Sequence, residues 1–183
     1  MSLDDLADDL YDVTVSDEPT AGGPDPYTVY LNSRFAEEKP RYVEAAIDIR
    51  LPAGRVRGRI DAVYESEPGS WEIVDFKSGR HRANPAALVQ LEAYAVAAAD
   101  GALSVQVPDQ IAVTFAYLGG GALEEVSVAV DDEWLTQARL HLAELTDAAA
   151  GPAFPQVPSS ACGRCDFLRF CEAGRAFVEQ AGH

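Results

Sequence analysis

The chain has 183 residues, of which 30 are Asp or Glu and 14 are Lys or Arg, so its formal net charge is −16. Apolar residues make up 48% and charged residues 24%, which is typical of a globular domain and excludes a mostly disordered chain. No apolar run approaches the roughly 18 residues that a membrane-spanning helix needs. The first residues lack the charged-then-apolar layout of a signal peptide. We therefore expect a cytoplasmic protein with no membrane partner.

The acidic surplus has two interpretations. A negative field repels phosphate, which argues against a nucleic-acid partner. Alternatively, a carboxylate-rich surface is an adaptation to the salty cytoplasm of a halophile. The scatter of acidic residues over the whole chain and the use of only two lysines, Lys39 and Lys77, favour the halophile. At about 1 M salt the Debye length is roughly 3 Å, so the net charge does not exclude DNA as a substrate.

Hydrophobic periodicity and turn residues divide most of the chain into strands and helices. Strands are predicted over 42–51, 55–65, 71–77, 110–118 and 122–130, and helices over about 86–99 and after Asp131. The resulting order β-β-β-α-β-β-α predicts an α/β (α+β) fold, with a central mixed β-sheet of about five strands flanked by helices.

Composition divides the chain into three parts. Residues 1–41 are an acidic N-terminal segment with Gly and Pro near residue 23, which predicts a peripheral or mobile segment. Residues 42–150 hold the predicted sheet and helices and form the core. Residues 151–183 begin with a proline-containing connector and hold all three cysteines. We expect this cysteine-bearing tail to pack on the core.

Two carboxylates and a lysine occupy neighbouring predicted strands. Side chains alternate along a strand, so Ile73, Asp75 and Lys77 share one face. If the strands over 55–65 and 71–77 pair as a hairpin, Asp61 lies beside Asp75. Two carboxylates this close need a cation between them, and hard oxygen ligands suit Mg²⁺ or Mn²⁺.

The common interpretation of an isolated Asp-x-Lys is a surface ion pair. Lys77, however, is a compact ammonium in a chain that otherwise uses arginine, and such a group can orient or deprotonate a water. The residues therefore indicate a metal-dependent hydrolytic site for a phosphate ester.

Further candidates lie on either side of this pair. Gln90 and Tyr94 are four residues apart and share a helix face. They are either the polar tips of a half-buried helix or groups that face the metal site or a nucleic-acid backbone. Glu44, on the polar side of its strand, is a weaker candidate.

Three motifs together resemble a known family: Gly58-Arg-Ile-Asp61, Ile73-Val-Asp75-Phe-Lys77 and Gln90-x-x-x-Tyr94. In this order and spacing they are similar to the PD-(D/E)xK nucleases, within them to the RecB-like branch found in UvrD/Rep-like helicases, in AddB and in CRISPR-associated exonucleases. The resemblance implies a restriction-endonuclease-like core and a Mg²⁺- or Mn²⁺-dependent DNA nuclease.

The same resemblance assigns roles to individual residues. It implies that Asp61, Asp75 and the Phe76 carbonyl are metal ligands, and that Lys77 serves the attacking water. Gln90 and Tyr94 would support the site or the DNA. DNA contacts are expected from arginines on one strand face and directly after the site strand: Arg55, Arg57, Arg59, Arg80 and Arg82.

The tail carries a second motif, Cys162-x2-Cys165-x5-Cys171. Thiols spaced this closely in an intracellular protein indicate metal ligands, and the alternative is three unpaired structural cysteines. Iron–sulfur members of the RecB-like branch have three such cysteines and a fourth far upstream around a [4Fe–4S] cluster. The resemblance therefore implies a cluster with an incomplete ligand set here.

The chain has no fourth cysteine, and its histidines all follow Asp61, although the family usually supplies an upstream histidine ligand. From these two departures we expect the C-terminal nuclease piece of a longer helicase-nuclease of DNA repair or recombination, weakly active on its own. There is no P-loop motif, so helicase motor domains would lie in the same or an associated polypeptide.

Two alternatives stay open. The first is a catalytically degenerate DNA-binding or interaction module of the same fold, which would not need Asp61, Asp75 and Lys77 together. The second is a small structural module in which only the cysteine tail matters.

Overall fold

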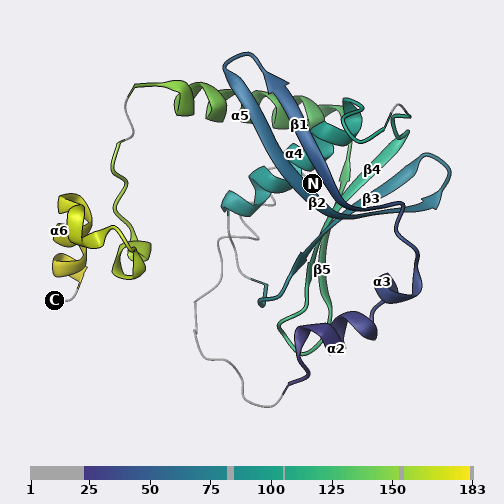
Figure 1. The fold of residues 1–183 in the computed structure, drawn as a ribbon, viewed down its shortest axis with the longest axis horizontal. Coiled ribbons are helices and arrows are strands. Elements are labelled where there is room, and N and C mark those ends of the chain that lie inside the picture. Colours follow the sequence, from purple (N-terminus) through teal and green to yellow (C-terminus); the bar gives the residue numbers. More distant parts are fainter. Residues whose placement is uncertain (1–22, 82–84, 105, 153–154, 182–183) are drawn as a thin grey trace. The chain divides into compact units, whose positions relative to one another are not determined.

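The computed structural model describes residues 23–81, 85–104, 106–152 and 155–181. Within these ranges the strands form one sheet in the order β1-β2-β3-β4-β5 (Figure 1). The strands are β1 (Tyr42–Leu51), β2 (Gly54–Glu67), β3 (Ser70–Lys77), β4 (Gln110–Tyr117) and β5 (Glu124–Val130). Neighbouring strands are antiparallel, except that β3 and β4 are parallel. The predicted mixed sheet of five strands is therefore confirmed.

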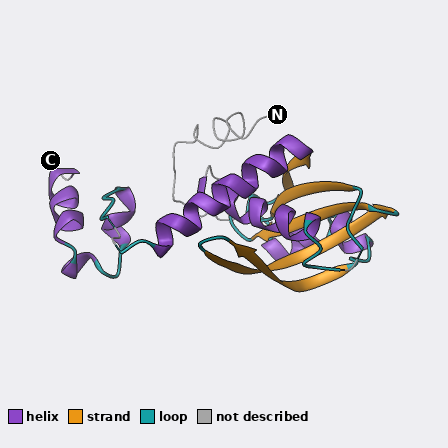
Figure 2. Ribbon diagram, turned by 90° about the horizontal axis from the view of Figure 1, so that it is seen from above, coloured by secondary structure: helices purple, strands orange, loops and turns teal. Residues whose placement is uncertain are grey.

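Helix α4 (Pro85–Ala99) connects β3 to β4, and such a crossover is what allows these two strands to run parallel. Its side chains are buried almost all round from Leu91 to Ala98, which makes it the centre of the larger core cluster. Helix α5 (Asp132–Ala150) joins the same cluster through Trp134, Ala138 and Leu142. Helices therefore flank the sheet, as the sequence predicts (Figure 2).

Side chains on the other face of the sheet form a second, smaller core. Ala62, Tyr64, Val74 and Ala116 surround Phe35, which is fully buried. Phe35 belongs to α3 (Arg34–Glu37), which follows α2 (Pro26–Leu31). The N-terminal segment was expected to be peripheral, and residues 26–37 differ from that expectation because Phe35 anchors them on the sheet.

Residues from Ala149 onward form a separate compact unit. It contains two short 3-10 turns, η1 (Ser160–Arg164) and η2 (Leu168–Phe170), followed by helix α6 (Glu172–Ala181). In the described part of the whole chain, no helix combines the length and the apolar character needed to cross a membrane.

Candidate active site

The C-terminal end of β3 carries a buried carboxylate and a half-buried ammonium. Asp75 is 2% exposed, and its Oδ2 lies 2.7 Å from Lys77 Nζ. The two side chains share one face of the strand, because they are two residues apart. The Lys77 ammonium is the partner of Asp75 Oδ2 among the described residues. A carboxylate has about four lone-pair sites, so the end of β3 keeps room for a further cation beside this ion pair.

A chain of hydrogen bonds joins Lys77 to α4 and back to β2. Lys77 Nζ donates to Gln90 Oε1 at 2.8 Å, and Gln90 Nε2 donates to the Tyr94 hydroxyl at 2.7 Å. The Tyr94 hydroxyl donates to the carbonyl oxygen of Arg59 at 2.7 Å and lies 3.5 Å from Asp75 Oδ1. Because a hydroxyl has one proton, the short bond to Arg59 takes it. Gln90 and Tyr94 thus orient the lysine and fasten α4 to β2.

Asp61 lies at an irregularity in β2. Ile60 and Val63 belong to the larger core cluster, whereas Ala62 and Tyr64 belong to the smaller one, so the strict alternation of faces slips by one position at Asp61. The described pairing of β2 with β3 ends at Ala62 and Val74. Beyond that pair, Asp61 Oδ2 accepts a hydrogen bond from the backbone N–H of Phe76 at 2.8 Å. At this point the Asp61 side chain, instead of the backbone, forms the hydrogen bond between β2 and β3. This bond holds Asp61 against the strand that carries Asp75.

Glu44, in β1, also lies at an irregular point of its strand. Its φ is +51°, which is uncommon for a residue with a side chain and costs free energy that neighbouring contacts must offset. Its carboxylate lies 3.2 Å from Arg59 Nη1 in an exposed ion pair. Glu44 therefore borders the site through an arginine rather than through Asp75.

Burial sets the electrostatics of the pair. Burial has the largest effect, and it keeps the pKa of Asp75 above its ordinary value. The bonds and charge of Lys77 lower this pKa in part, and the nearby Asp61 carboxylate raises it further. Burial also raises the pKa of Tyr94 to about 12, so this hydroxyl stays protonated as a donor. A cation beside the two carboxylates would relieve both the burial and the mutual repulsion.

The carboxylates at this site fit Mg²⁺ as the divalent cation. Among the described residues, no three His, Cys, Asp or Glu side chains gather closely enough to hold a metal ion. Mg²⁺ does not require such a set, since it keeps several waters and is commonly bound by only one or two carboxylates. The carboxylates of Asp75 and Asp61, which interact electrostatically, satisfy that lower requirement.

The predicted DNA-contacting arginines are distributed around this centre. Arg57 and Arg59 line a hollow of about 410 Å³ together with Gln90 and Tyr94. Arg80 lines a second hollow of about 300 Å³ together with Lys77. Arg82 lies outside the described residues.

Three of the predicted DNA-contacting arginines already have acidic partners: Arg55, Arg57 and Arg59. Arg55 Nε donates to Asp48 Oδ1 at 2.9 Å, and Arg57 Nε lies 3.3 Å from Asp48 Oδ2. Arg59 is paired with Glu44, and both side chains are more than half exposed. Exposed ion pairs of this kind contribute little, about 0 to 1 kcal/mol, so a phosphate can compete for them.

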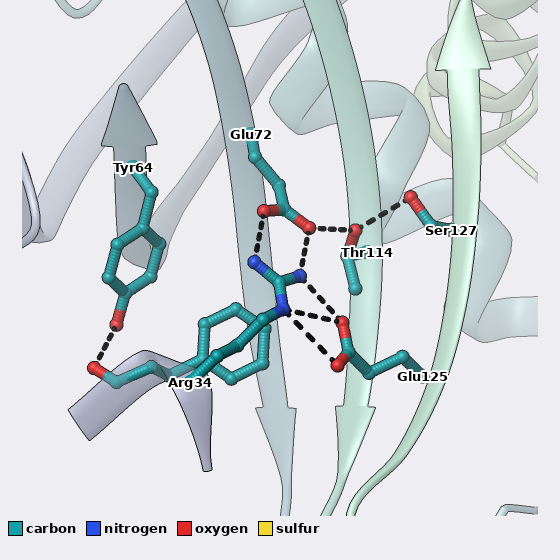
Figure 3. Close-up of polar contacts among 7 residues, drawn as sticks. Arg34, Tyr64, Glu72, Thr114, Glu125 and Ser127 are labelled. Carbon is teal, nitrogen blue, oxygen red and sulfur yellow. Dashed lines mark hydrogen bonds and ion pairs between the residues drawn. The ribbon is translucent and has the colours of Figure 1, made fainter. Parts of the chain in front are cut away.

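On the other face of the sheet, Arg34 clamps α3 to the strands (Figure 3). Its two terminal nitrogens bond both carboxylate oxygens of Glu72, at 2.7 and 2.8 Å, and Nη2 also lies 2.6 Å from Glu125 Oε2. Thr114 Oγ1 donates to the same Glu72 carboxylate at 2.7 Å. Burial alone would raise the pKa of Glu72, but the bonds from Arg34 and Thr114 bring it below its ordinary value.

This clamp supports the site through aromatic contacts. Phe35 and Tyr30 both meet the Phe76 ring edge-on, with centroids 5.2 and 5.5 Å away. The Phe76 backbone is therefore held by ring packing on one side and by Asp61 on the other. Sequence analysis missed this segment, although Asp25-Pro26 is a helix-start signal: Asp25 Oδ1 accepts from Thr28 N at 3.1 Å.

In the second unit, two of the three cysteine sulfurs flank Gly174. A Cβ at Gly174 would lie 3.3 Å from Cys171 Sγ and 3.6 Å from Cys162 Sγ. Each of these sulfurs accepts a backbone N–H bond at 3.3 Å, from Gly174 and Ser159 respectively. Cys165 is exposed, and the three described cysteines do not gather into a group that could hold a metal ion by themselves.

A mixed sheet with paired carboxylates and a lysine at the end of one central strand defines a class of phosphodiester-hydrolysing domains. Residues 25–172 match the model of the PD-(D/E)XK nuclease superfamily. The chain therefore belongs to this nuclease superfamily.

Two solved structures are similar to this chain. The crystal structure of SSO0001 has 17% sequence identity and a TM-score of 0.45, with 81% of this chain covered. The crystal structure of a "putative exonuclease" from Eubacterium rectale has 12% identity and a TM-score of 0.42, with 76% covered. The chain spans 66% and 62% of the lengths of these two proteins. No curated protein matches the sequence.

Proposed function

We propose that this chain hydrolyses DNA phosphodiester bonds with a divalent cation held by Asp61, Asp75 and the carbonyl of Phe76. The single observation that carries the proposal is the buried Asp75 carboxylate, which has Lys77 on one side and the like charge of Asp61 nearby. Two carboxylates that share one ammonium favour a further cation between them. When bound there, Mg²⁺ would supply charge that stabilises the transition state and favours deprotonation of water.

The chain's own groups have separable roles in this reaction. Lys77 has three N–H donors, of which Gln90 and Asp75 can engage two, so one is left for a water or a phosphate oxygen. Lys77 is 31% exposed at its side chain, so a substrate can reach it. Gln90 and Tyr94 are positioning residues, because they act by holding Lys77 and α4.

The test is cleavage of an end-labelled DNA with added Mg²⁺, combined with Mn²⁺ titration by calorimetry. Asp75→Asn should lower both the cleavage rate and the affinity for Mn²⁺. Lys77→Met should lower the rate by about a hundredfold or more while leaving the affinity for Mn²⁺ almost unchanged. Glu133→Gln, an exposed change in the first turn of α5, is the control. Wild-type activity in Asp75→Asn would overturn the proposal.

We propose further that the nuclease works beside a helicase motor, as in RecB-like helicase-nucleases, in a salty cytoplasm. The motif resemblance and the −16 charge support this context. A motor that holds DNA near the site raises its local concentration, which offsets the loss of phosphate binding in high salt. Adding the motor in trans at about 1 M KCl should stimulate cleavage. Cleavage that is unaffected by the motor would contradict this context.

For the tail, we propose that Cys162 and Cys171 are ligands of a metal centre, of which a [4Fe–4S] cluster is one form. The geometry supports this, because both sulfurs lie beside Gly174 and each accepts a backbone N–H bond, as the sulfur ligands of iron–sulfur clusters do. Gly174→Ala places a Cβ against both sulfurs and should lower metal content after anaerobic reconstitution. Gly163→Ala has no atom within 4 Å of the new Cβ and is the matched control. Equal metal content in both variants would contradict the proposal.

A further inference from the structure

A groove of about 470 Å³ opens beside Asp61, between α2, the start of β1, the middle of β2 and the end of β3. A volume in this range is typical of sites that bind small organic groups. Its walls are mainly rings and apolar side chains: Pro26, Tyr27, Tyr30, Pro40, Val43, Ala62, Tyr64, Phe76 and Leu118. Its polar lining residues are Glu44 and Asp61. The groove therefore reaches one of the proposed metal ligands.

The composition of the groove determines which part of a nucleic acid it suits. None of the residues that line it is Lys, Arg or His, so the groove itself offers no cation to a phosphate. Flat aromatic walls suit the face of a nucleobase, and carboxylates such as Glu44 can accept from the amino groups on base edges. Arg59 lies 3.2 Å from Glu44, which lines the groove, and can meet the DNA backbone at the groove's edge.

Two tyrosines of α2 differ in their availability. Tyr30 is half-buried and packs edge-on against Phe76, so it forms part of the fixed wall. Tyr27 is 68% exposed at the same groove, although a large aromatic side chain normally gains free energy from burial. Tyr27 is therefore the ring with an open face.

The groove is held in shape before any ligand binds. Arg34 fixes α3 to Glu72 and Glu125 (Figure 3), and Tyr64 donates a hydrogen bond to the Phe35 carbonyl at 3.2 Å. Ser33 Oγ donates to the carbonyl of Tyr30 at 2.6 Å, which fixes α2 relative to α3. A rigid aromatic wall loses little conformational entropy on binding.

We propose that this groove binds an unpaired nucleobase of the DNA, stacked on Tyr27, next to the phosphodiester bond that is hydrolysed at Asp61 and Asp75. The inference rests on the proposed function, because the shared residue Asp61 is what connects the groove with the reacting phosphate. A base in a duplex is stacked on both faces and paired along its Watson–Crick edge, so it can enter the groove only after it has left the stack. The groove therefore selects single-stranded DNA or a frayed end over an intact duplex.

The experiment uses the full chain and an eight-nucleotide single strand that carries one 2-aminopurine, with Ca²⁺ as the added cation. Stacking on Tyr27 should quench the fluorescence, and the single strand should bind more tightly than the blunt duplex of the same sequence. Tyr27→Ala should weaken single-strand binding by about five- to tenfold and leave duplex binding unchanged, since stacking on an exposed ring is at the low end of the usual range. Tyr27→Phe keeps the ring and should behave like the wild type.

Two further variants make the result decisive. Leu31→Ala removes an exposed side chain of the same helix that does not line the groove, so it should leave binding unchanged. Val43→Trp, at an exposed strand position of the groove, should fill it and abolish the quenching while circular dichroism stays native.

The outcomes separate this inference from the proposed function. Unchanged binding in Tyr27→Ala, or an equal loss for single strand and duplex, would overturn the base-binding groove even if Mg²⁺-dependent cleavage is observed. Quenching that depends on Tyr27 supports the groove even if no cleavage is observed, in which case only the proposed function fails.

Discussion

Gln90 Oε1 and Lys77 Nζ lie 2.8 Å apart, so a helix side chain holds the only described lysine of the strand that carries Asp75. A free lysine side chain samples many rotamers, and a second anchor besides Asp75 restricts it to those that face the site. The contact joins two elements with different roles. β3 supplies the charged groups, and α4 orients the lysine side chain.

Gln90→Ala should therefore lower the rate of DNA cleavage by about tenfold and leave the affinity for Mn²⁺ unchanged, because the lysine loses its orientation and the carboxylates do not. The free energy of unfolding should fall by only about 1 kcal/mol. Steady-state cleavage, calorimetry and urea denaturation measure the three quantities. Gln137→Ala, exposed on α5, is the matched control. An equal loss of rate in both variants would argue against an orienting role.

Gly119 packs against the backbone that follows Lys77. A Cβ there would lie 2.4 Å from the Ser78 carbonyl oxygen and 2.5 Å from the Gly79 carbonyl carbon, which real Cβ atoms do not tolerate. Gly119→Ala should displace this loop, cost about 1 to 3 kcal/mol of stability and reduce cleavage.

Gly120→Ala gives the matched comparison, since its new Cβ would be no closer than 3.8 Å to the nearest atom, the Ala122 carbonyl oxygen. It should stay within about 0.5 kcal/mol of the wild type. Thermal denaturation and the cleavage assay decide between the two. Similar behaviour of both variants would show that the loop moves without consequence.

The sequence was sufficient to predict the strands, the crossover helix and the cap at Asp131, because these depend on local periodicity and turn chemistry. Asp131 Oδ1 accepts from Trp134 N at 2.8 Å, as a helix cap does. The expectation that Asp61 lies beside Asp75 came from local pairing as well, since the two strands are joined by a short turn, and the role of the two carboxylates as metal ligands stays a prediction.

What could not be predicted depends on contacts between distant residues. Arg34 meets Glu72 and Glu125 across three elements, and no periodicity in the sequence connects them. The slip of alternation at Asp61 and the positive φ of Glu44 likewise have no signal in the local sequence. These features shape the groove, which is why the sequence indicated the carboxylates but not the surface beside them.

Removal of the Arg34 clamp should have a pH-dependent cost. The folded-state pKa of Glu72 lies below its usual 4.5, so the stability that it contributes is present above pH 4.5 and is lost as the pH falls through the lowered value. Arg34→Ala should cost about 1 to 2 kcal/mol at neutral pH, less than for a fully buried pair because the Arg34 side chain is 39% exposed.

The gap between wild type and Arg34→Ala should narrow in urea denaturation as the pH is lowered below 4.5. Arg139→Ala removes a comparable arginine, paired with Asp100 at 2.6 Å but exposed on both sides. It should cost no more than about 1 kcal/mol. A gap that is independent of pH would contradict the assignment of this stability to Glu72.

Glu92 should give the opposite dependence on pH. It is 2% exposed on α4, and His141 Nδ1 of α5 lies 2.7 Å from its carboxylate. Burial raises its pKa above 4.5, although the charge and the hydrogen bond of His141 lower it in part. The folded state therefore holds this proton to a higher pH than the unfolded chain does. The resulting stability is complete below pH 4.5 and is lost as the pH rises through the folded-state value.

Glu92→Gln keeps the shape of the protonated side chain and cannot ionise, so it should escape this loss. Its stability relative to the wild type should increase as the pH rises from 4 towards 7, by at most about 1.4 kcal/mol per pH unit for a single proton. Urea denaturation across that range measures the difference, and taking the difference cancels the other titrating groups that both proteins share. Glu144→Gln, exposed on α5, should give a flat difference. A flat difference for Glu92→Gln as well would mean that the folded protein pays no cost for ionising this buried carboxylate, because the pairing with His141 then offsets its burial in full.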